Sequence, residues 1–296
     1  MKSILFFLAF LMLAAPMSRG DSFTDEITAG MKIIWAVQTN VWPPTNKIWS
    51  YKVIPQHFSD VAISNLMTSL GTKNLNINLA SGCINYQDEK AIASMVSSIT
   101  NVPEPVVGVP SRKETYQLGL KYLRLAGIDI SQLAVKPDGK LKTTFWLGTR
   151  GWWDTNHNFI NETNSWGVDF YRRIDGIDTI GGSAAFFEFG NNAKVSDLQI
   201  SWRNLEPHQL LDHFVTPEQI VQSIQNGKTP FLPRIRTAWR FGKVKTLTIT
   251  DAEPCYEMKP AGDTMNFVTP VLQLSAVMNN GTTNWPISFR RSIFPP

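Results

Sequence analysis

The chain has 296 residues, of which 43% are hydrophobic and 18% charged, a composition that excludes a disordered chain and is typical of globular proteins. Its formal net charge is +4 at pH 7. Lys2 and Arg19 are the only charged residues among the first twenty, so the 28 basic residues fall to 26 against 24 acidic ones in the remainder. A charge balance this close to neutral gives no indication of a nucleic-acid partner.

Residues 1–20 have the pattern of a secretory signal peptide. Lys2 supplies a positive start, residues 4–15 form an apolar run, and Ser18 and Gly20 are the small residues that precede a cleavage site. A membrane-spanning helix needs about 20 apolar residues, more than this run provides. We therefore expect a secreted or extracytoplasmic protein (periplasm, cell envelope or extracellular) with no membrane span in the mature chain.

Three helices are predicted in the first half of the chain. Residues 56–70 have apolar side chains at helical spacing and end at Gly71, where a helix end favours a left-handed residue. The short alternating segment 75–79 predicts a strand, and 88–99 predicts a second helix. The third helix, 111–127, begins with a capping box formed by Ser111 and Glu114.

A run of antiparallel strands is predicted to follow the third helix. A hairpin is expected between 132–136 and 141–150, because the Asp138-Gly139 step supplies the left-handed conformations of a tight turn. The polar, tryptophan-bearing segment 151–165 is expected to be a loop. Further strands are predicted at the following segments: 166–174, 183–189 and 195–202.

The same order is expected to begin again near residue 206. His208 and His213 are placed in a helical turn, and the helix 216–227 begins with a second capping box, formed by Thr216 and Gln219. Strands are then predicted at 243–250, 267–278 and 284–290. The sequence thus predicts an α+β fold of repeated units, each with one helix packed on an antiparallel meander sheet.

The corresponding domain prediction has a signal peptide and three further units. These are 1–20 (signal peptide), 21–105 (an N-terminal helix–strand unit), 106–205 (a helix plus antiparallel sheet) and 206–296 (a second helix plus antiparallel sheet).

Several segments resemble secreted bacterial domains of the PepSY and cystatin-like type, which include the YycH/YycI-type accessory regulators of sensor kinases. The resemblance rests on the helix 111–127, the segment 170–177, Gly181-Gly182, the strand–turn–strand 187–202, the helix 216–227 and the closing strands around Pro270. It implies a helix packed on a curved antiparallel sheet and a binding or inhibitory role without catalysis. It implies no catalytic residues.

Two cysteines and two glycosylation triplets are present. In an oxidising compartment, Cys83 and Cys255 can form one disulfide, worth about 4–5 kcal/mol in the loop-entropy model; the alternative is two separate buried thiols. Asn161 and Asn280 each begin an Asn-x-Thr acceptor triplet. For Asn280 a hairpin turn is the favoured interpretation, because Asn-Gly is a strong turn signal.

No catalytic motif in the sequence is strong enough to name a reaction. His208 and His213 are five residues apart, which points two helical side chains about 140° apart rather than toward one metal ion. A glycoside-hydrolase interpretation could use the strand carboxylates Asp169 and Glu188 beside the loop 151–165. We expect no cofactor and no metal.

Tryptophan is the residue type that stands out, with ten in the chain. Beside an asparagine-rich loop, such rings could stack on sugars or serve as protein-binding anchors; the structural alternative is that most of them lie in the core. The candidate contact residues are Trp152, Trp153, Asp154, Asn158 and Trp166. We expect a non-enzymatic binding or regulatory protein with a protein partner; the alternative is a polysaccharide-binding protein or glycan-active hydrolase that uses 151–166.

Overall fold

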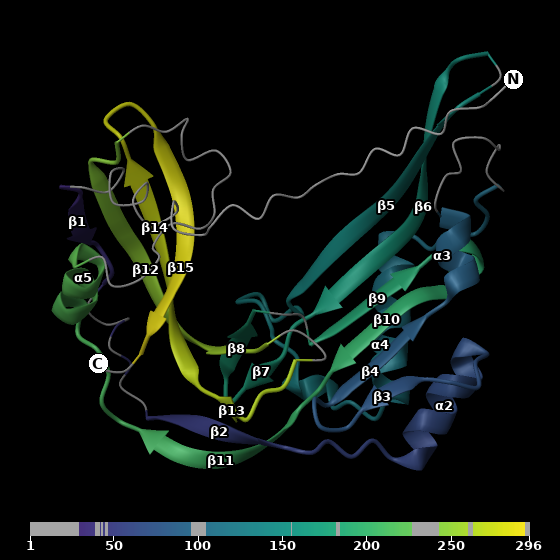
Figure 1. The fold of residues 1–296 in the computed structure, drawn as a ribbon, viewed down its shortest axis with the longest axis horizontal. Helices are drawn as coiled ribbons and strands as arrows, with labels where there is room; N and C mark the ends of the chain where they lie inside the picture. The colour runs from purple at the N-terminus through teal and green to yellow at the C-terminus, as the bar shows by residue number, and fades with distance from the viewer. Residues whose placement is uncertain are drawn as a thin grey trace, which may run out of the picture.

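The structure is a computed structural model that describes residues 30–38, 42, 44, 47–95, 105–154, 156–181, 184–226, 243–259 and 263–293. The predicted signal peptide, 1–20, lies outside the described residues, as do Gly227 and the last residues of the predicted helix 88–99. Figure 1 shows two large sheets standing on either side of a curved ribbon of strands.

The first sheet is antiparallel throughout. In spatial order it contains β3 (Asn76–Asn78), β4 (Cys83–Gln87), β10 (Val195–Ser201), β9 (Ala185–Phe189), β6 (Phe159–Phe170) and β5 (Thr143–Trp153). Strand β9 alternates buried and partly buried side chains, the pattern of a sheet with one face packed on a core.

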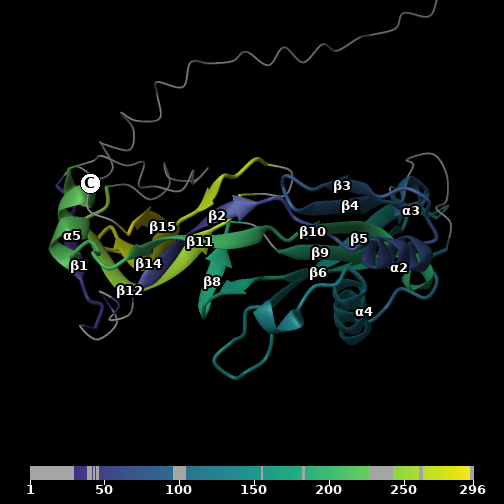
Figure 2. The ribbon, with the colours of Figure 1, turned by 90° about the horizontal axis from the view of Figure 1, so that it is seen from below.

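Three helices accompany this sheet. They are α2 (Asp60–Leu70), α3 (Glu89–Met95) and α4 (Arg112–Leu125). Helix α4 contacts β6 and β9, and α2 in turn contacts α4, whereas α3 contacts β10. Figures 1 and 2 both show α4 on one side of the strands. Gly119 allows this close approach, because a Cβ at that position would lie 2.6 Å from the Phe170 ring.

The second sheet mixes antiparallel and parallel pairs. Its strands are β15 (Asn284–Ser292), β14 (Pro270–Asn279), β12 (Thr246–Glu257), β8 (Ile177–Ile180) and β7 (Arg173–Ile174), with β1 (Lys32–Trp35) also paired to β12. Both β1 and β8 are parallel to β12. Helix α5 (Pro217–Gln225) contacts β1 rather than covering a meander.

A third sheet joins the two halves of the molecule. It consists of β11 (Asn204–Leu211), β2 (Ile48–Ile54) and β13 (Phe267–Val268). Strands β2 and β11 form the curved ribbon along the bottom of Figure 1, between the two larger sheets. Buried apolar residues form one cluster for each half, and residues 30–95 contribute to both.

Two buried arginines lie where the halves meet. The Arg203 guanidinium donates hydrogen bonds to the Lys259 carbonyl (3.1 Å) and the Asp263 carbonyl (2.9 Å), which follow β12. The Arg172 guanidinium donates to the Arg203 carbonyl (2.6 Å) and lies over the Trp202 ring. Burial lowers the pKa of Arg172 to about 10 and also lowers the pKa of Arg203. These side chains therefore connect β10 and β11 to the end of β12.

The predicted repetition of a helix on a meander sheet is wrong. The protein is α+β and has antiparallel sheets, but strand dominates, and the described residues form three sheets with different pairings. The prediction paired strands that are close in sequence. Instead, β1 and β2 from the first 54 residues pair with strands more than 140 residues later, whose partners no local pattern reveals.

Three local predictions also need correction. The segment of His208 is strand β11 rather than a helical turn. The turn at Gly139 forms, but residues 132–136 make only isolated bridges, because β5 pairs with β6 instead. Most of the predicted loop 151–165 is strand. By contrast, the capping boxes of α4 and α5 are confirmed.

Candidate functional site

A two-stranded arm extends from the first sheet. Strand β6 pairs with β9 from Trp166 to Phe170, whereas in the described part of the chain residues 159–165 pair with β5 alone. Figure 1 shows this end of β5 and β6 projecting away from the other strands, at the upper right. We call residues 149–165 the β5–β6 arm. Its exposed large apolar side chains lie toward the tip, whereas Arg150, Asn164 and Ser165 are buried.

The end of the β5–β6 arm carries an exposed aromatic pair. Trp153 and Phe159 are opposite each other in register, with ring centroids 5.3 Å apart and ring planes at 62°. The two residues are 67% and 58% exposed, respectively. Gly151 leaves room for the Phe159 ring, because a Cβ at position 151 would overlap that ring. The chain thus holds two large apolar rings in solvent.

An ion pair stiffens the arm behind these rings. Arg150 and Glu162 are opposite each other in register, and the Arg150 Nε donates to Glu162 Oε1 at 2.6 Å. The Arg150 side chain is buried, and its guanidinium lies 5.4 Å from the centre of the Trp152 ring. A buried charged hydrogen bond of this kind fixes geometry more firmly than an exposed pair. Cross-strand contact therefore supports the arm up to its tip.

The turn of the arm is held by Asp154. Its Oδ1 accepts hydrogen bonds from the backbone N–H groups of Asn156 and Asn158, each at 2.8 Å, and its Oδ2 accepts one from the Asn158 side chain at 3.1 Å. These bonds to Asn158 and Asn156 lower the pKa of Asp154. The carboxylate stays ionised and keeps the turn closed, so Asp154 and Asn158 orient the tip.

The predicted contact residues fall in two places. Trp152, Trp153, Asp154 and Asn158 lie together at the tip, whereas Trp166 lies where β6 enters the sheet and pairs with Phe189. Phe159 and Ile160, both exposed at the tip, were not among the predicted contact residues. The sequence feature that could have indicated them is the apolar pair Phe159-Ile160 directly after the polar turn, which mirrors Trp152-Trp153 before it.

The two asparagines of the glycosylation triplets differ in setting. Asn161 is exposed on β6, opposite Gly151. Asn280 lies in the turn between β14 and β15, and its Oδ1 accepts hydrogen bonds from the backbone N–H groups of Thr282 (3.0 Å) and Thr283 (2.9 Å). Asn280 therefore has the turn role that the Asn-Gly step predicts.

The two cysteines lie in different sheets and are not bonded to each other. Cys83 is in β4 and Cys255 in β12, and both are buried. Burial raises the pKa of Cys255 to about 12, which keeps its thiol protonated and unreactive at neutral pH.

We expect a thiol-reactive dye to label neither cysteine in the folded protein and both after unfolding in denaturant without reductant. Titration of labelled thiols by absorbance measures this directly. Absence of labelling after unfolding would show that Cys83 and Cys255 form a disulfide.

The histidines provide no metal site in the part of the chain that the structure describes. His213 contacts its neighbour Asp212 at 2.6 Å, and the His208 ring packs against Phe267. No group of three metal-ligating side chains occurs among the described residues. Of the helices described, none combines the length and the hydrophobicity that crossing a membrane requires.

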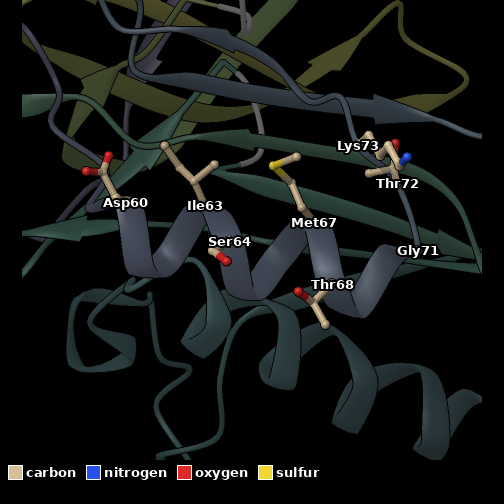
Figure 3. Close-up of a pocket in the computed structure, with 8 residues that line it drawn as sticks. All are labelled: Asp60, Ile63, Ser64, Met67, Thr68, Gly71, Thr72 and Lys73. Carbon is tan, nitrogen blue, oxygen red and sulfur yellow. The ribbon is translucent and has the colours of Figure 1, made fainter.

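The hollow along α2, about 580 Å³ in volume, is open and lacks converging charges. Figure 3 shows Asp60 at one end of its lining and Lys73 at the other, with Ile63, Ser64, Met67 and Thr68 between them along the helix. The hollow therefore brings no pair of ionisable side chains together. The exposed rings of the β5–β6 arm are the stronger candidate for function.

Comparison with known proteins gives no family. No family model matches the chain, and no curated protein matches it. Among solved structures, it is similar to an uncharacterized protein from Eubacterium rectale ATCC 33656, with 9% sequence identity and a TM-score of 0.43 over 94% of this chain and 96% of that one. The resemblance to PepSY and cystatin-like domains thus stays an expectation.

Proposed function

We propose that this chain is an exported, non-enzymatic binding or regulatory protein that contacts a protein partner through the tip of its β5–β6 arm. The supporting observation is the Trp153–Phe159 pair, two exposed rings held at the end of a braced hairpin. Burying such rings in a partner would gain apolar contact at little entropic cost, because the arm already fixes them. Tryptophan is also among the residues that contribute most to protein interfaces.

A protein partner fits the tip better than a sugar or a lipid surface. The two ring planes are inclined at 62° and form no common flat platform on which a sugar ring could lie. The Asp154 carboxylate and the Asn158 amide are used within the turn. A lipid surface would first have to bury this polar turn, which lies beyond the rings, at the cost of its hydration.

The proposal is tested by capturing the partner with an immobilised chain from the medium or envelope of the native source, followed by titration of the purified partner. We expect Trp153→Ala with Phe159→Ala to weaken binding about 30-fold, the effect of losing roughly 2 kcal/mol at an interface hot spot.

The matched control is Trp49→Ala with Phe267→Ala, since these two rings are also exposed (37% and 44%) but lie on β2 and β13. The control should bind within about twofold of the unmodified chain. If both double variants bind equally well, the tip is not the contact and the proposal is wrong.

A further inference from the structure

Helix α4 packs on one face of the first sheet, and the opposite face carries the exposed side chains of Trp146, Gln199 and Gln87. Figures 1 and 2 show α4 on one side of the strands. Successive side chains of a strand point to opposite faces, so the alternate side chains lie on the other side. We call this the open face. By register, its residues are Thr144, Trp146, Gly167, Asp169, Phe186, Glu188, Asp197, Gln199, Asn85 and Gln87. None of them is lysine or arginine.

Trp146 is the exposed aromatic ring of the open face. It is 56% exposed on β5, and its indole Nε1 donates a hydrogen bond to the Asp169 carboxylate. Its cross-strand neighbour is Gly167, which adds no side chain between Trp146 and the Phe186 ring. The hydrogen bond to Asp169 fixes the orientation of the indole. The sheet thereby presents a single oriented platform, unlike the inclined pair at the arm tip.

Planar polar side chains continue across the strands from this platform. The Glu188 carboxylate accepts a hydrogen bond from the Ser165 hydroxyl at 2.6 Å, and the Asp197 carboxylate accepts one from Gln87 at 3.3 Å. Each carboxylate has acceptor capacity left after one such bond. Gln199 is exposed in the next row. Glu188 and Asp197 are both partly exposed and place negative charge on this face, whereas the Asp169 carboxylate is buried and holds the Trp146 indole.

We propose that the open face binds a glycan chain of neutral or amino sugars, with one sugar ring stacked on Trp146. The apolar C–H face of a pyranose packs on an indole, while its hydroxyl groups donate to planar carboxylate and amide oxygens. The carboxylates repel uronic-acid chains and nucleic acids. This site shares no residue with the arm tip, so glycan binding here does not depend on the proposed protein contact.

The test is titration by intrinsic tryptophan fluorescence with defined hexasaccharides of three kinds: neutral, amino and uronic. We expect saturable binding of a neutral or amino hexasaccharide, weakened at least tenfold by Trp146→Ala and only partly by Trp146→Phe, which keeps a stacking ring. Trp153→Ala, which removes the more exposed tryptophan of the same hairpin, should leave this binding unchanged.

Three outcomes would overturn the inference. They are no saturable binding of any of the three hexasaccharides at millimolar concentration, tightest binding of the uronic chain, and equal loss of binding in Trp146→Ala and Trp153→Ala. Calorimetry on the same variants confirms that any fluorescence change reports binding.

Discussion

Replacement of Arg203 by alanine is expected to lower the free energy of unfolding by about 3–5 kcal/mol. Arg203 is 1% exposed and donates to Ser201 Oγ, the Lys259 carbonyl and the Asp263 carbonyl. Each hydrogen bond to a charged group contributes about 1.5–3 kcal/mol, and the carbonyls left behind would be buried without a donor. Since these bonds join the two halves, the transition should also become less cooperative.

Equilibrium denaturation monitored by fluorescence and circular dichroism measures this effect. Arg290→Ala is the matched control, because Arg290 pairs with Glu257 at a site where both side chains are over 40% exposed. An exposed pair contributes about 0–1 kcal/mol, so this control should remain close to the unmodified protein. Equal stability of the two variants would mean that Arg203 does not hold the halves together.

Gly82→Ala is expected to destabilise the protein by at least about 2 kcal/mol more than Gly71→Ala. Both glycines have left-handed backbones, with φ of +63° and +66°, so both substitutions carry the same conformational cost of about 1–2 kcal/mol. A Cβ at Gly82 would lie 2.8 Å from the Trp202 carbonyl oxygen and 2.9 Å from the Arg203 Cα, whereas one at Gly71 meets nothing within 4 Å.

The additional cost at Gly82 comes from backbone atoms that cannot rotate away. The Gly82 carbonyl also accepts a hydrogen bond from the Trp202 N–H at 2.7 Å. To make room for a Cβ at position 82, the β3–β4 turn would have to move away from the backbone of Trp202 and Arg203. Chemical denaturation of both variants gives the difference. Equal losses would show that left-handed geometry alone, and not the close approach, determines the requirement for glycine at 82.

The sequence predicted features whose causes are local. Ser111 with Glu114 and Thr216 with Gln219 form the capping boxes of α4 and α5, because each box needs only residues three apart. The Asn-Gly step likewise turns β14 into β15. These signals depend on neighbouring residues, and tertiary packing does not override them.

What the sequence could not predict depends on distant partners. Tyr256 donates a hydrogen bond to the Trp49 carbonyl, 207 positions away, and β1 lies parallel to β12. The arm was missed for a different reason. Its strand residues Asn161, Glu162 and Thr163 have no apolar alternation, because neither face of the arm packs on a core. Phe159 lies opposite Trp153 only because β5 and β6 pair as far as the tip, and this pairing could not be predicted from the sequence.

The most direct test of the account is a photo-crosslinking side chain placed at Asn156, the exposed turn of the β5–β6 arm. Its control is the same group at Lys140, in the exposed turn before the other end of β5. After irradiation in native extract, mass spectrometry should find one discrete protein adduct for position 156 and not for position 140. Identical adducts at both positions, or none at 156, would contradict a protein contact through the arm.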